Sequence, residues 1–459
     1  MPHFQSFLSP AEGIEFPALL QGPAATSLAL QAQLNESQWW DQQNITKQQL
    51  KQLSHLLAYS YNNVPFYRKS FDANNWIPTQ LATLKDLQQI PVLSRKELQN
   101  AGHLITSNAT PQDHGRLFDT TTSGSTGMPV KLKRSIYVNQ IWDGLILREH
   151  NWYQRDLTSE HCTIKYAPKG TWEAPFGHIQ KGWGSASSLL YENGIASYLN
   201  SSASIDTQAK WLKHRNPKYL FIYPTNLQAL AKEVIKQNLK LTNLKQIRTN
   251  GEAYPDGLRE LCQEAFGQVD IADIYGTLEV GFIAFQCPEH KKYHIQSENV
   301  LVEILDEKNQ PCPQGKIGKV VITSLNNYAT PLIRYEIGDY ASFGEQCECG
   351  RGLPVLEKIF GRTRNMLKLP DGSSHWPTFG YRNYEDIAPI EQFQIIQKSL
   401  DELEVRLVVP NKLSNQQENS LSKVIQESMR YPFTIRYTYM DNIPRSASNK
   451  FEEFMSEIL

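Results

Sequence analysis

The residues best suited to chemistry include a run of hydroxyl and glycine residues at 120–134, TTTSGSTGMPVKLKR. Backbone N–H groups and hydroxyls in such a loop can converge on anionic oxygens, and glycine permits the backbone angles that this requires. The segment is not a Walker A loop, because GK[ST] does not follow a glycine at the required spacing, and it is not GxGxxG. It therefore predicts another kind of phosphate loop, with a Ser/Gly-rich surface loop as the alternative. The candidate phosphate ligands are Ser123, Gly124, Ser125, Thr126 and Gly127.

A second chemically capable group is a pair of cysteine segments, CPEH at 287–290 and CEC at 347–349. Four soft or borderline ligands without a spare position suit structural Zn²⁺, and the candidates are Cys287, His290, Cys347 and Cys349. The spacing is looser than that of a repeated CxxC pair, and His294 competes with His290 for the fourth place. The alternative is reduced buried cysteines or a redox pair, since cysteine is commonly buried in any case.

Elements that alternate between helix and strand must position these residues. Apolar residues recur at helical spacing in 50–57 and 227–235. Short β-branched or aromatic runs predict strands at 219–223, 269–275, 300–305 and 320–325. This alternation favours an α/β body.

The pattern restarts after Gly361, which indicates a second unit of about a hundred residues. A PDG turn at 370–372 is followed by a predicted strand at 403–409. A helix then carries one apolar face, formed by Leu421, Val424, Ile425 and Met429. These elements predict a compact α+β domain.

Composition excludes several classes of protein. The chain has 459 residues, of which 40% are hydrophobic, so it has enough apolar material for a core and no signature of disorder. With 46 basic against 47 acidic residues the formal charge is −1, so no overall field attracts nucleic acid or an anionic membrane. No stretch approaches the roughly 18 apolar residues of a membrane span. We expect a cytoplasmic protein with a small ligand.

Six segments in order resemble the motifs of the adenylate-forming enzymes, the superfamily of acyl-CoA synthetases, peptide-synthetase adenylation domains and luciferases. Within it the chain is most similar to the phenylacetate-CoA ligase branch and its capsule-biosynthesis relatives, through NVPFYRKSF and YPTNL. The six segments are TTTSGSTGMPVKLKR (120–134), TNGEAY (249–254), DIYGTLEVG (273–281), PLIRYEIGDY (331–340), GRTRNMLKLPDG (361–372) and IPRSASNKFEEF (443–454).

The resemblance implies a large N-terminal AMP-binding domain, residues 1–361, and a small mobile C-terminal domain, residues 362–459, that carries a catalytic lysine. It also implies an AMP-forming acid–thiol ligase. Such an enzyme joins a carboxylic acid to ATP, releases pyrophosphate, and passes the acyl group to a thiol. Aryl acids fit this branch of the superfamily. The expected cofactors are ATP, Mg²⁺, and CoA or the phosphopantetheine of a carrier protein as acceptor.

By the same resemblance, the loop 123–127 cradles the β- and γ-phosphates. Tyr275 stacks on adenine beside Gly276, Thr277 donates to the α-phosphate, and Glu279 holds Mg²⁺, a hard cation that prefers oxygen ligands. Thr277 and Glu279 therefore count as catalytic candidates.

Five further residues complete the expected site. Gly251 and Glu252 resemble the segment along the adenine edge, Asp339 accepts from the ribose hydroxyls, and Arg362 meets ribose or phosphate oxygens. Lys450 is the catalytic lysine that offsets developing negative charge during adenylation.

Three positions depart from the family pattern: Val130 replaces the usual lysine after the loop's proline, Asn365 replaces a frequent acidic hinge residue, and Asn449 replaces the glycine before the catalytic lysine. Two alternatives therefore stay open beside the thiol ligase. One is an amide-forming ligase, in which an amine replaces the thiol. The other is a catalytically silent nucleotide sensor, which the retention of Glu279, Asp339, Arg362 and Lys450 disfavours.

Overall fold

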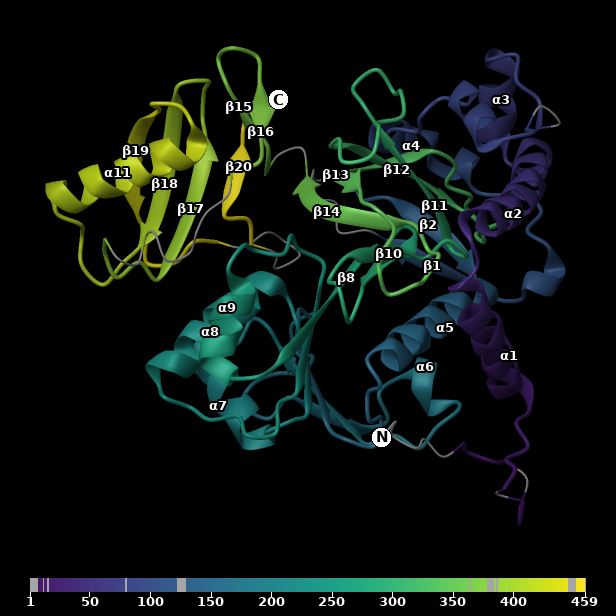
Figure 1. Ribbon diagram of the computed structural model, residues 1–459, viewed down its shortest axis with the longest axis horizontal. Helices are drawn as coiled ribbons and strands as arrows, with labels where there is room; N and C mark the ends of the chain where they lie inside the picture. Colours follow the sequence, from purple (N-terminus) through teal and green to yellow (C-terminus); the bar gives the residue numbers. More distant parts are fainter. Residues whose placement is uncertain are drawn as a thin grey trace.

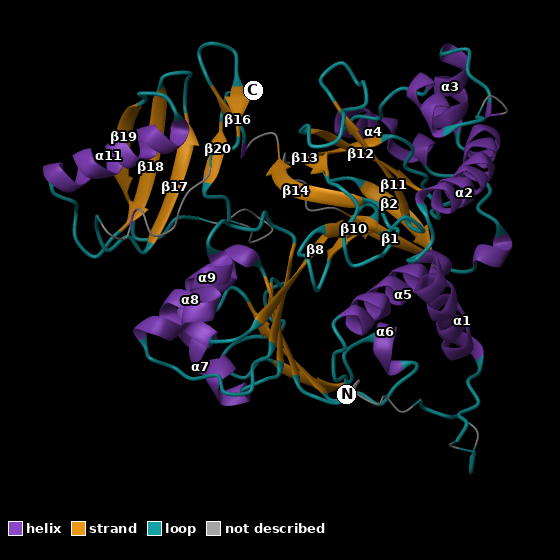
Figure 2. Cartoon of the chain, viewed as in Figure 1, coloured by secondary structure: helices purple, strands orange, loops and turns teal. Residues whose placement is uncertain are grey.

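The computed structural model describes residues 7–10, 12–14, 16–78, 81–121, 129–362, 365–377, 384, 387–444 and 451–458. A large α/β body is followed by a smaller α+β domain, and the two lie side by side in Figures 1 and 2. Predicted strands at 219–223, 269–275, 300–305 and 320–325 are all confirmed. Within the described residues, no helix is long and apolar enough to cross a membrane.

Four helices open the body: α1 (Gly22–Ser37), α2 (Gln42–Asn63), α3 (Pro65–Ala73) and α4 (Arg95–Ala101). The start of α4 is fixed by a capping box, in which the Ser94 hydroxyl accepts from the Glu97 N–H and the Glu97 carboxylate accepts from the Ser94 N–H. This cap makes Arg95 the first residue of the helix. Short 3₁₀ turns lie at Leu84–Gln89, Gly102–Ile105 and Gln112–His114.

A twelve-stranded sheet forms the centre of the body, in the order β11-β12-β13-β14-β10-β9-β8-β7-β6-β3-β5-β4. Its strands β5, β3, β6, β7 and β8 run parallel to one another, and the remaining pairs are antiparallel. The bounds are β3 (His161–Lys165), β4 (His178–Lys181), β5 (Ile195–Asn200), β6 (Tyr219–Ile222), β7 (Gln246–Asn250), β8 (Asp270–Thr277), β9 (Gly281–Gln286), β10 (Tyr293–Ile295), β11 (Val300–Leu305), β12 (Gly318–Ser324), β13 (Tyr335–Phe343) and β14 (Val355–Arg362).

Helices cover both faces of the parallel strands. On one side α7 (Ile205–Arg215), α8 (Pro224–Lys236) and α9 (Leu258–Phe266) lie together, while α5 (Ile136–Trp152) and α6 (Ser185–Ser188) lie on the other (Figure 1). The first face is an apolar core, in which strand residues such as Ile164, Leu220 and Ile247 pack against helix residues such as Leu230 and Cys262. Burial of this face anchors the carboxyl ends of the strands.

In the C-terminal domain, a four-stranded sheet has helix α11 (Asn415–Met429) packed on it (Figure 2). Its core includes the predicted helix residues Leu421, Ile425 and Met429 together with Leu403 and Phe454. The sheet order is β19-β18-β17-β20, and the strands are β17 (Gln392–Gln397), β18 (Glu402–Val408), β19 (Thr434–Tyr439) and β20 (Phe454–Ser456). A two-stranded ribbon, β15 (Leu367–Lys368) with β16 (Ser374–His375), precedes them. The predicted α+β fold of this part of the chain is confirmed.

Candidate active site and metal cluster

The predicted phosphate loop falls between two paired strands, β1 (Leu117–Thr121) and β2 (Lys131–Ser135). Thr121 lies opposite Lys131, so the pair forms the neck of a hairpin. The loop residues 123–127 themselves lie outside the described residues, as does Lys450. Val130, which stands where the family pattern has lysine, is only 3% exposed and belongs to the main core of the body. Its side chain therefore contributes packing.

Strand β8 carries Tyr275, Gly276 and Thr277 to its carboxyl end. The Tyr275 hydroxyl donates to Asp339 Oδ2 at 3.0 Å, and burial together with the Asp339 charge raises the pKa of this phenol well above its ordinary value. A β-carbon on Gly276 would lie 2.7 Å from the carbonyl oxygen of Gly281, so this close strand approach requires glycine. The Thr277 hydroxyl accepts from the N–H of Val280 at 3.3 Å.

Glu279 occupies the turn that follows β8, and it is paired with a cation. Its carboxylate lies 3.1 Å from Arg95 Nη1, and only 11% of the Glu279 side chain is exposed. Arg95 also donates to the Tyr335 hydroxyl at 3.4 Å. Arg95 was not among the residues predicted from the sequence, because its partner is 184 positions away in the chain. An ion pair this shielded keeps the Glu279 carboxylate in one place.

Asp339 and Arg362 face each other across β13 and β14. The register pairs these two residues, and Arg362 Nε lies 3.9 Å from Asp339 Oδ1. With the Tyr275 bond, the structure links three predicted nucleotide-binding residues in one cluster. We call Tyr275, Asp339 and Arg362 the ribose cluster, after the role predicted for Asp339.

Glu252 joins the body to the C-terminal domain. Its carboxylate accepts from the Thr225 N–H at 3.0 Å and from the Thr225 hydroxyl at 2.7 Å. It also accepts from the N–H of Phe451 at 3.3 Å. Gly251, just before it, has a φ of 83°, in the left-handed region that favours glycine. The predicted adenine-edge segment is thus also an interdomain contact.

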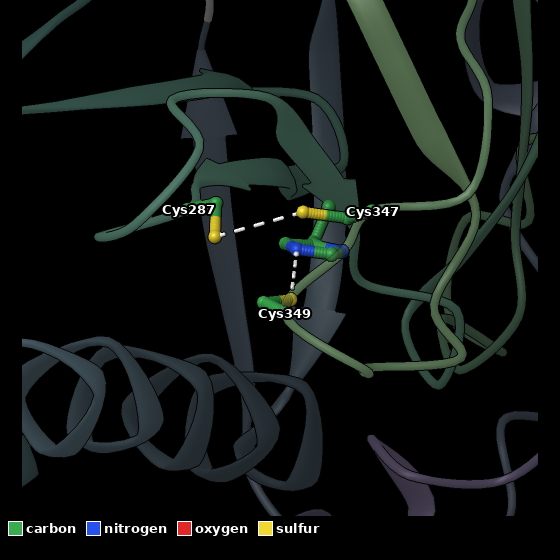
Figure 3. Close-up of side chains that lie close together, drawn as sticks. Cys287, Cys347 and Cys349 are labelled. Atoms are coloured by element: carbon green, nitrogen blue, oxygen red, sulfur yellow. Dashed lines mark hydrogen bonds between the residues drawn. The ribbon is translucent and has the colours of Figure 1, made fainter.

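The cysteine segments meet between the end of β9, strand β10 and the segment after β13. Ligand atoms of Cys287, His294, Cys347 and Cys349 all lie within 4.8 Å of one another, and Figure 3 shows the three cysteines converging. The Cys347 and Cys287 sulfurs are 3.8 Å apart, and Cys349 Sγ lies 3.3 Å from His294 Nε2. Tetrahedral zinc with Zn–S bonds of about 2.3 Å separates its sulfurs by about 3.8 Å, so the arrangement fits this ion.

The histidine of this cluster is His294, the competing candidate, and not His290, which was predicted in the ligand set. His290 lies outside the group, with Nδ1 4.0 Å from a Glu348 carboxylate oxygen. The reason is the β9–β10 hairpin, in which the Cys287 N–H donates to Lys292 O and Tyr293 pairs with Gln286. Side chains on one face repeat every second residue, so His294 shares the face of Cys287 while His290 lies in the turn.

The protonation state of His294 also suits a metal ligand, whereas Cys347 would have to release a proton to a bound ion. Burial lowers the pKa of His294 to about 4, so its imidazole is neutral, and Nδ1 lies 3.4 Å from the Leu353 carbonyl oxygen. A hydrogen bond from Nδ1 to a carbonyl leaves Nε2 as the metal-binding atom. Burial raises the pKa of Cys347 to about 12, and hydrogen bonds from Arg351 outweigh burial to lower that of Cys349. Each of the six cysteines is a free thiol.

The chain is similar to known proteins along most of its length. The AMP-binding enzyme family matches residues 33–329, and the CapK C-terminal domain family matches residues 381–457. The phenylacetate-coenzyme A ligase of Thermus thermophilus is 27% identical, over 72% of this chain and 73% of that protein. Protein CapK of Staphylococcus aureus is 21% identical, over 85% of each chain.

Solved structures share the fold at low sequence identity. The 2-hydroxyisobutyryl-CoA ligase in its postadenylation state, with 2-HIB-AMP, is 18% identical and has a TM-score of 0.71, over 91% of this chain and 90% of that one. The same ligase in the thioesterification state has a TM-score of 0.59, with 92% and 91% covered at 18% identity.

The α/β body, the separate C-terminal domain and the polar groups at the strand ends define an adenylate-forming enzyme. Because the AMP-binding family matches well over half of the residues, the chain belongs to the AMP-binding enzyme family, in its phenylacetate-CoA ligase-like branch. The predicted family, fold class and class of enzyme, an AMP-forming acid–thiol ligase, are confirmed, and the relatives indicate an acid–CoA ligase.

Proposed function

We propose that this protein activates a small carboxylic acid with ATP and Mg²⁺, and transfers the acyl group from the adenylate to the thiol of CoA. A carboxylate is a poor electrophile, because it is anionic and would have to expel oxide. Joining it to the α-phosphate, with release of pyrophosphate, supplies AMP as a leaving group. The thiol sulfur then attacks the acyl carbon, the thioester bond forms, and AMP departs. The observation that carries the proposal is the ribose cluster beside the Glu279 turn.

Each residue near the strand ends has a part in this scheme. The ribose cluster holds the nucleoside, with Asp339 accepting from the ribose hydroxyls and the Tyr275 ring against adenine. Glu279 provides a carboxylate for Mg²⁺, and Thr277 a hydroxyl for the α-phosphate. Gly251 and Glu252 run along the adenine edge, with Gly276 at the close strand approach.

The phosphate loop and the lysine complete the first step. The phosphates that leave are neutralised by Ser123, Gly124, Ser125, Thr126 and Gly127. The pairing of β1 with β2 supports this role, because it holds the two ends of the loop side by side. Lys450 offsets charge on the α-phosphate and the reacting carboxylate.

The second domain changes position between the two steps, about a hinge at Arg362 and Asn365, with the domains divided at residues 361 and 362. One contact supports a hinge on the N-terminal side of Asn365. The side-chain amide of Asn365 donates to the carbonyl of Phe454 in β20 at 2.7 Å. This bond ties Asn365 to the C-terminal sheet, so Asn365 and the sheet move together.

The acceptor and the resident metal are the finer parts of the proposal. CoA is the acceptor named by the relatives' titles, and a carrier-protein phosphopantetheine presents the same thiol. Cys287, His294, Cys347 and Cys349 would hold one Zn²⁺, which when bound joins β9, β10 and the segment after β13. The ion's role is structural, because its ligand set leaves no open position.

ATP–pyrophosphate exchange over a panel of aryl, alkyl and amino acids tests the proposal. We expect exchange that requires both an acid and Mg²⁺, followed by thioester formation when CoA is added. Glu279→Gln should lower exchange at least about tenfold by weakening the metal site. Glu192→Gln, at an exposed position before β5, is the matched control and should leave exchange unchanged.

Three outcomes contradict the proposal in different ways. Nucleotide binding without exchange across the whole panel identifies a sensor. Exchange followed by amide formation, with no thioester, identifies an amide ligase. An unchanged rate and Mg²⁺ requirement in Glu279→Gln removes Glu279 from the site.

A further inference from the structure

The parallel part of the sheet changes direction at β3. From β3 the chain passes through β4 and α6 to β5 on one side, and then returns across β3 to β6, β7 and β8 on the other. The connections through α7, α8 and α9 cover one face, whereas α6 lies on the opposite face (Figure 1). Ligands of open α/β sheets bind outside the carboxyl ends of the strands at such a reversal. The residue at the carboxyl end of β3 is Lys165.

Lys165 is a cation held inside the protein. The residue is 8% exposed, and its ammonium group donates to the side-chain carbonyl of Asn250. The nitrogen lies 3.7 Å from the centre of the Tyr223 ring and 4.2 Å from that of Phe221. Aromatic faces attract a cation, but they replace only part of the hydration that a buried ammonium loses.

The side chain belongs to the face that lies away from the apolar core. Cys162 and Ile164 on β3 pack among the residues of α7, α8 and α9. Because side chains alternate along a strand, Lys165 is on the other face, towards α5 and α6. Ring and amide groups from the neighbouring strand ends, Tyr223 and Asn250, accompany it there.

This cation is continuous with the proposed nucleotide site. Asn250, which accepts from Lys165, is followed directly by Gly251 and Glu252. Tyr223 comes just before the Thr225 that holds Glu252. Lys165 thus contacts the residue that comes directly before the segment proposed for the adenine edge, at the carboxyl ends of the strands where the nucleotide is proposed to bind.

We propose that Lys165 determines substrate specificity, by donating to a second oxygen acceptor on the acyl part of the acid. The inference rests on the proposed function and names the substrate class: an acid that bears a hydroxyl, a carbonyl or another carboxylate besides the carboxylate that reacts. An ammonium group can only donate, so the group that faces it must accept. An acid with an apolar group there would place against the ammonium a group that cannot accept a hydrogen bond, and is rejected for that reason.

The test compares acids of matched size in the exchange assay: phenylacetate, its ring-methyl form, its ring-hydroxyl form and its ring-carboxyl form. We expect the full-length wild-type protein to use an acceptor-bearing acid with a kcat/KM at least about tenfold above that of the methyl form. In Lys165→Met this preference should fall to within about twofold, because the acceptor-bearing acid loses rate and the methyl form does not. A larger loss of kcat/KM for the ring-carboxyl acid would identify the acceptor on the substrate as anionic. A larger loss for the ring-hydroxyl acid would identify it as neutral.

Two controls keep the outcome decisive. Lys210→Met, at a side chain that is 66% exposed and paired with Asp206, should leave the ratio of the acids unchanged. If Lys165→Met does not fold, Lys165→Arg is used instead; it retains a donor and should keep the preference for acceptor-bearing acids. The kcat/KM ratio of the acids in the wild-type protein is a test that needs no variant.

The inference is overturned if the wild-type protein does not discriminate between the acids, or if Lys165→Met slows all of them equally. The second result would assign Lys165 to the reacting carboxylate or to packing. Failure of the proposed function looks different, because then no acid supports exchange at all.

Discussion

The metal cluster and the nucleotide site contrast in how their polar groups are held. In the cluster, three sulfurs and one imidazole nitrogen converge within 4.8 Å of each other, so the ligand atoms are assembled in advance. At the strand ends, each charged group has a partner within the protein: Glu279 has Arg95, and Asp339 has Tyr275 and Arg362. The first arrangement suits an ion that stays, and the second suits a ligand that must replace internal partners and later leave.

Lys450→Ala tests the catalytic side of this contrast and has the largest expected effect. Removing one charge-stabilising group should slow adenylate formation by about 10²-fold or more. A chemically supplied acyl-adenylate should still react with CoA at near the wild-type rate, because the lysine serves only the first step. Exchange and thioester assays on the same preparation measure the two half-reactions.

Lys412→Ala, at another lysine of the C-terminal domain, is the control for this experiment and should leave both rates unchanged. An equal fall of both half-reactions in folded Lys450→Ala would show that the lysine is not specific to one step. Two unchanged rates would mean that the motif IPRSASNK has no catalytic part, and the proposal of a domain rotation would lose its main support.

Cys347→Ser tests the other side of the comparison, and its effect should appear in stability. If the cluster holds zinc, elemental analysis of the wild-type protein should find about one equivalent per chain. The variant should lose the ion and its Tm should fall by several degrees, while the rate of exchange at low temperature changes less than about twofold.

Two further variants sharpen this result. His294→Ala should behave like Cys347→Ser, whereas His290→Ala should keep both the ion and the wild-type Tm. A metal-free wild-type protein of full stability would reject the site. Loss of the ion in His290→Ala, with retention in His294→Ala, would return the ligand set to the one predicted from sequence.

Local patterns in the sequence were sufficient for much of the fold, and the family motifs named residues that the structure brings together. The β-branched runs at 300–305 and 320–325 are strands because such residues fit a buried pleated surface. The helix with Leu421, Ile425 and Met429 was evident from its spacing. Motif order was likewise sufficient to group Tyr275, Asp339 and Arg362 in one site.

What local patterns could not give are the pairings between distant segments. The exchange of His294 for His290 depends on the register of the β9–β10 hairpin, which the CPEH spacing does not reveal. Arg95 reaches Glu279 only because α4 packs against β13. Lys165 lies at the end of a strand, but its position at the reversal of the sheet can be recognised only when the order of all five parallel strands is known.

The smallest expected effect concerns Glu453, a carboxyl group at the boundary between the domains. Burial raises the pKa of Glu453 from 4.5 to about 7, and the nearby charges of Glu252 and Asp256 add to this, while Lys232 and a hydrogen bond with Gln228 oppose it. A raised carboxyl pKa means that the docked arrangement binds the proton more tightly than the separated one. Docking is therefore favoured below the ordinary pKa and weakens as the pH rises through about 7.

Energy transfer between dyes placed on the two domains measures this docking. In the wild-type protein the docking equilibrium constant should decrease about tenfold between about pH 6 and pH 8. Glu453→Gln, a neutral isostere of the protonated acid, should stay docked over this range, whereas Glu457→Gln, paired with Lys398 on the same domain, should follow the wild-type curve. Equal slopes in all three proteins would assign the pH response to other groups. A flat Glu453→Gln curve would show that the pH response of docking comes from the single proton on Glu453. The interdomain contact beside the nucleotide site would then depend on pH, in contrast to the metal cluster, whose ligand atoms are already assembled.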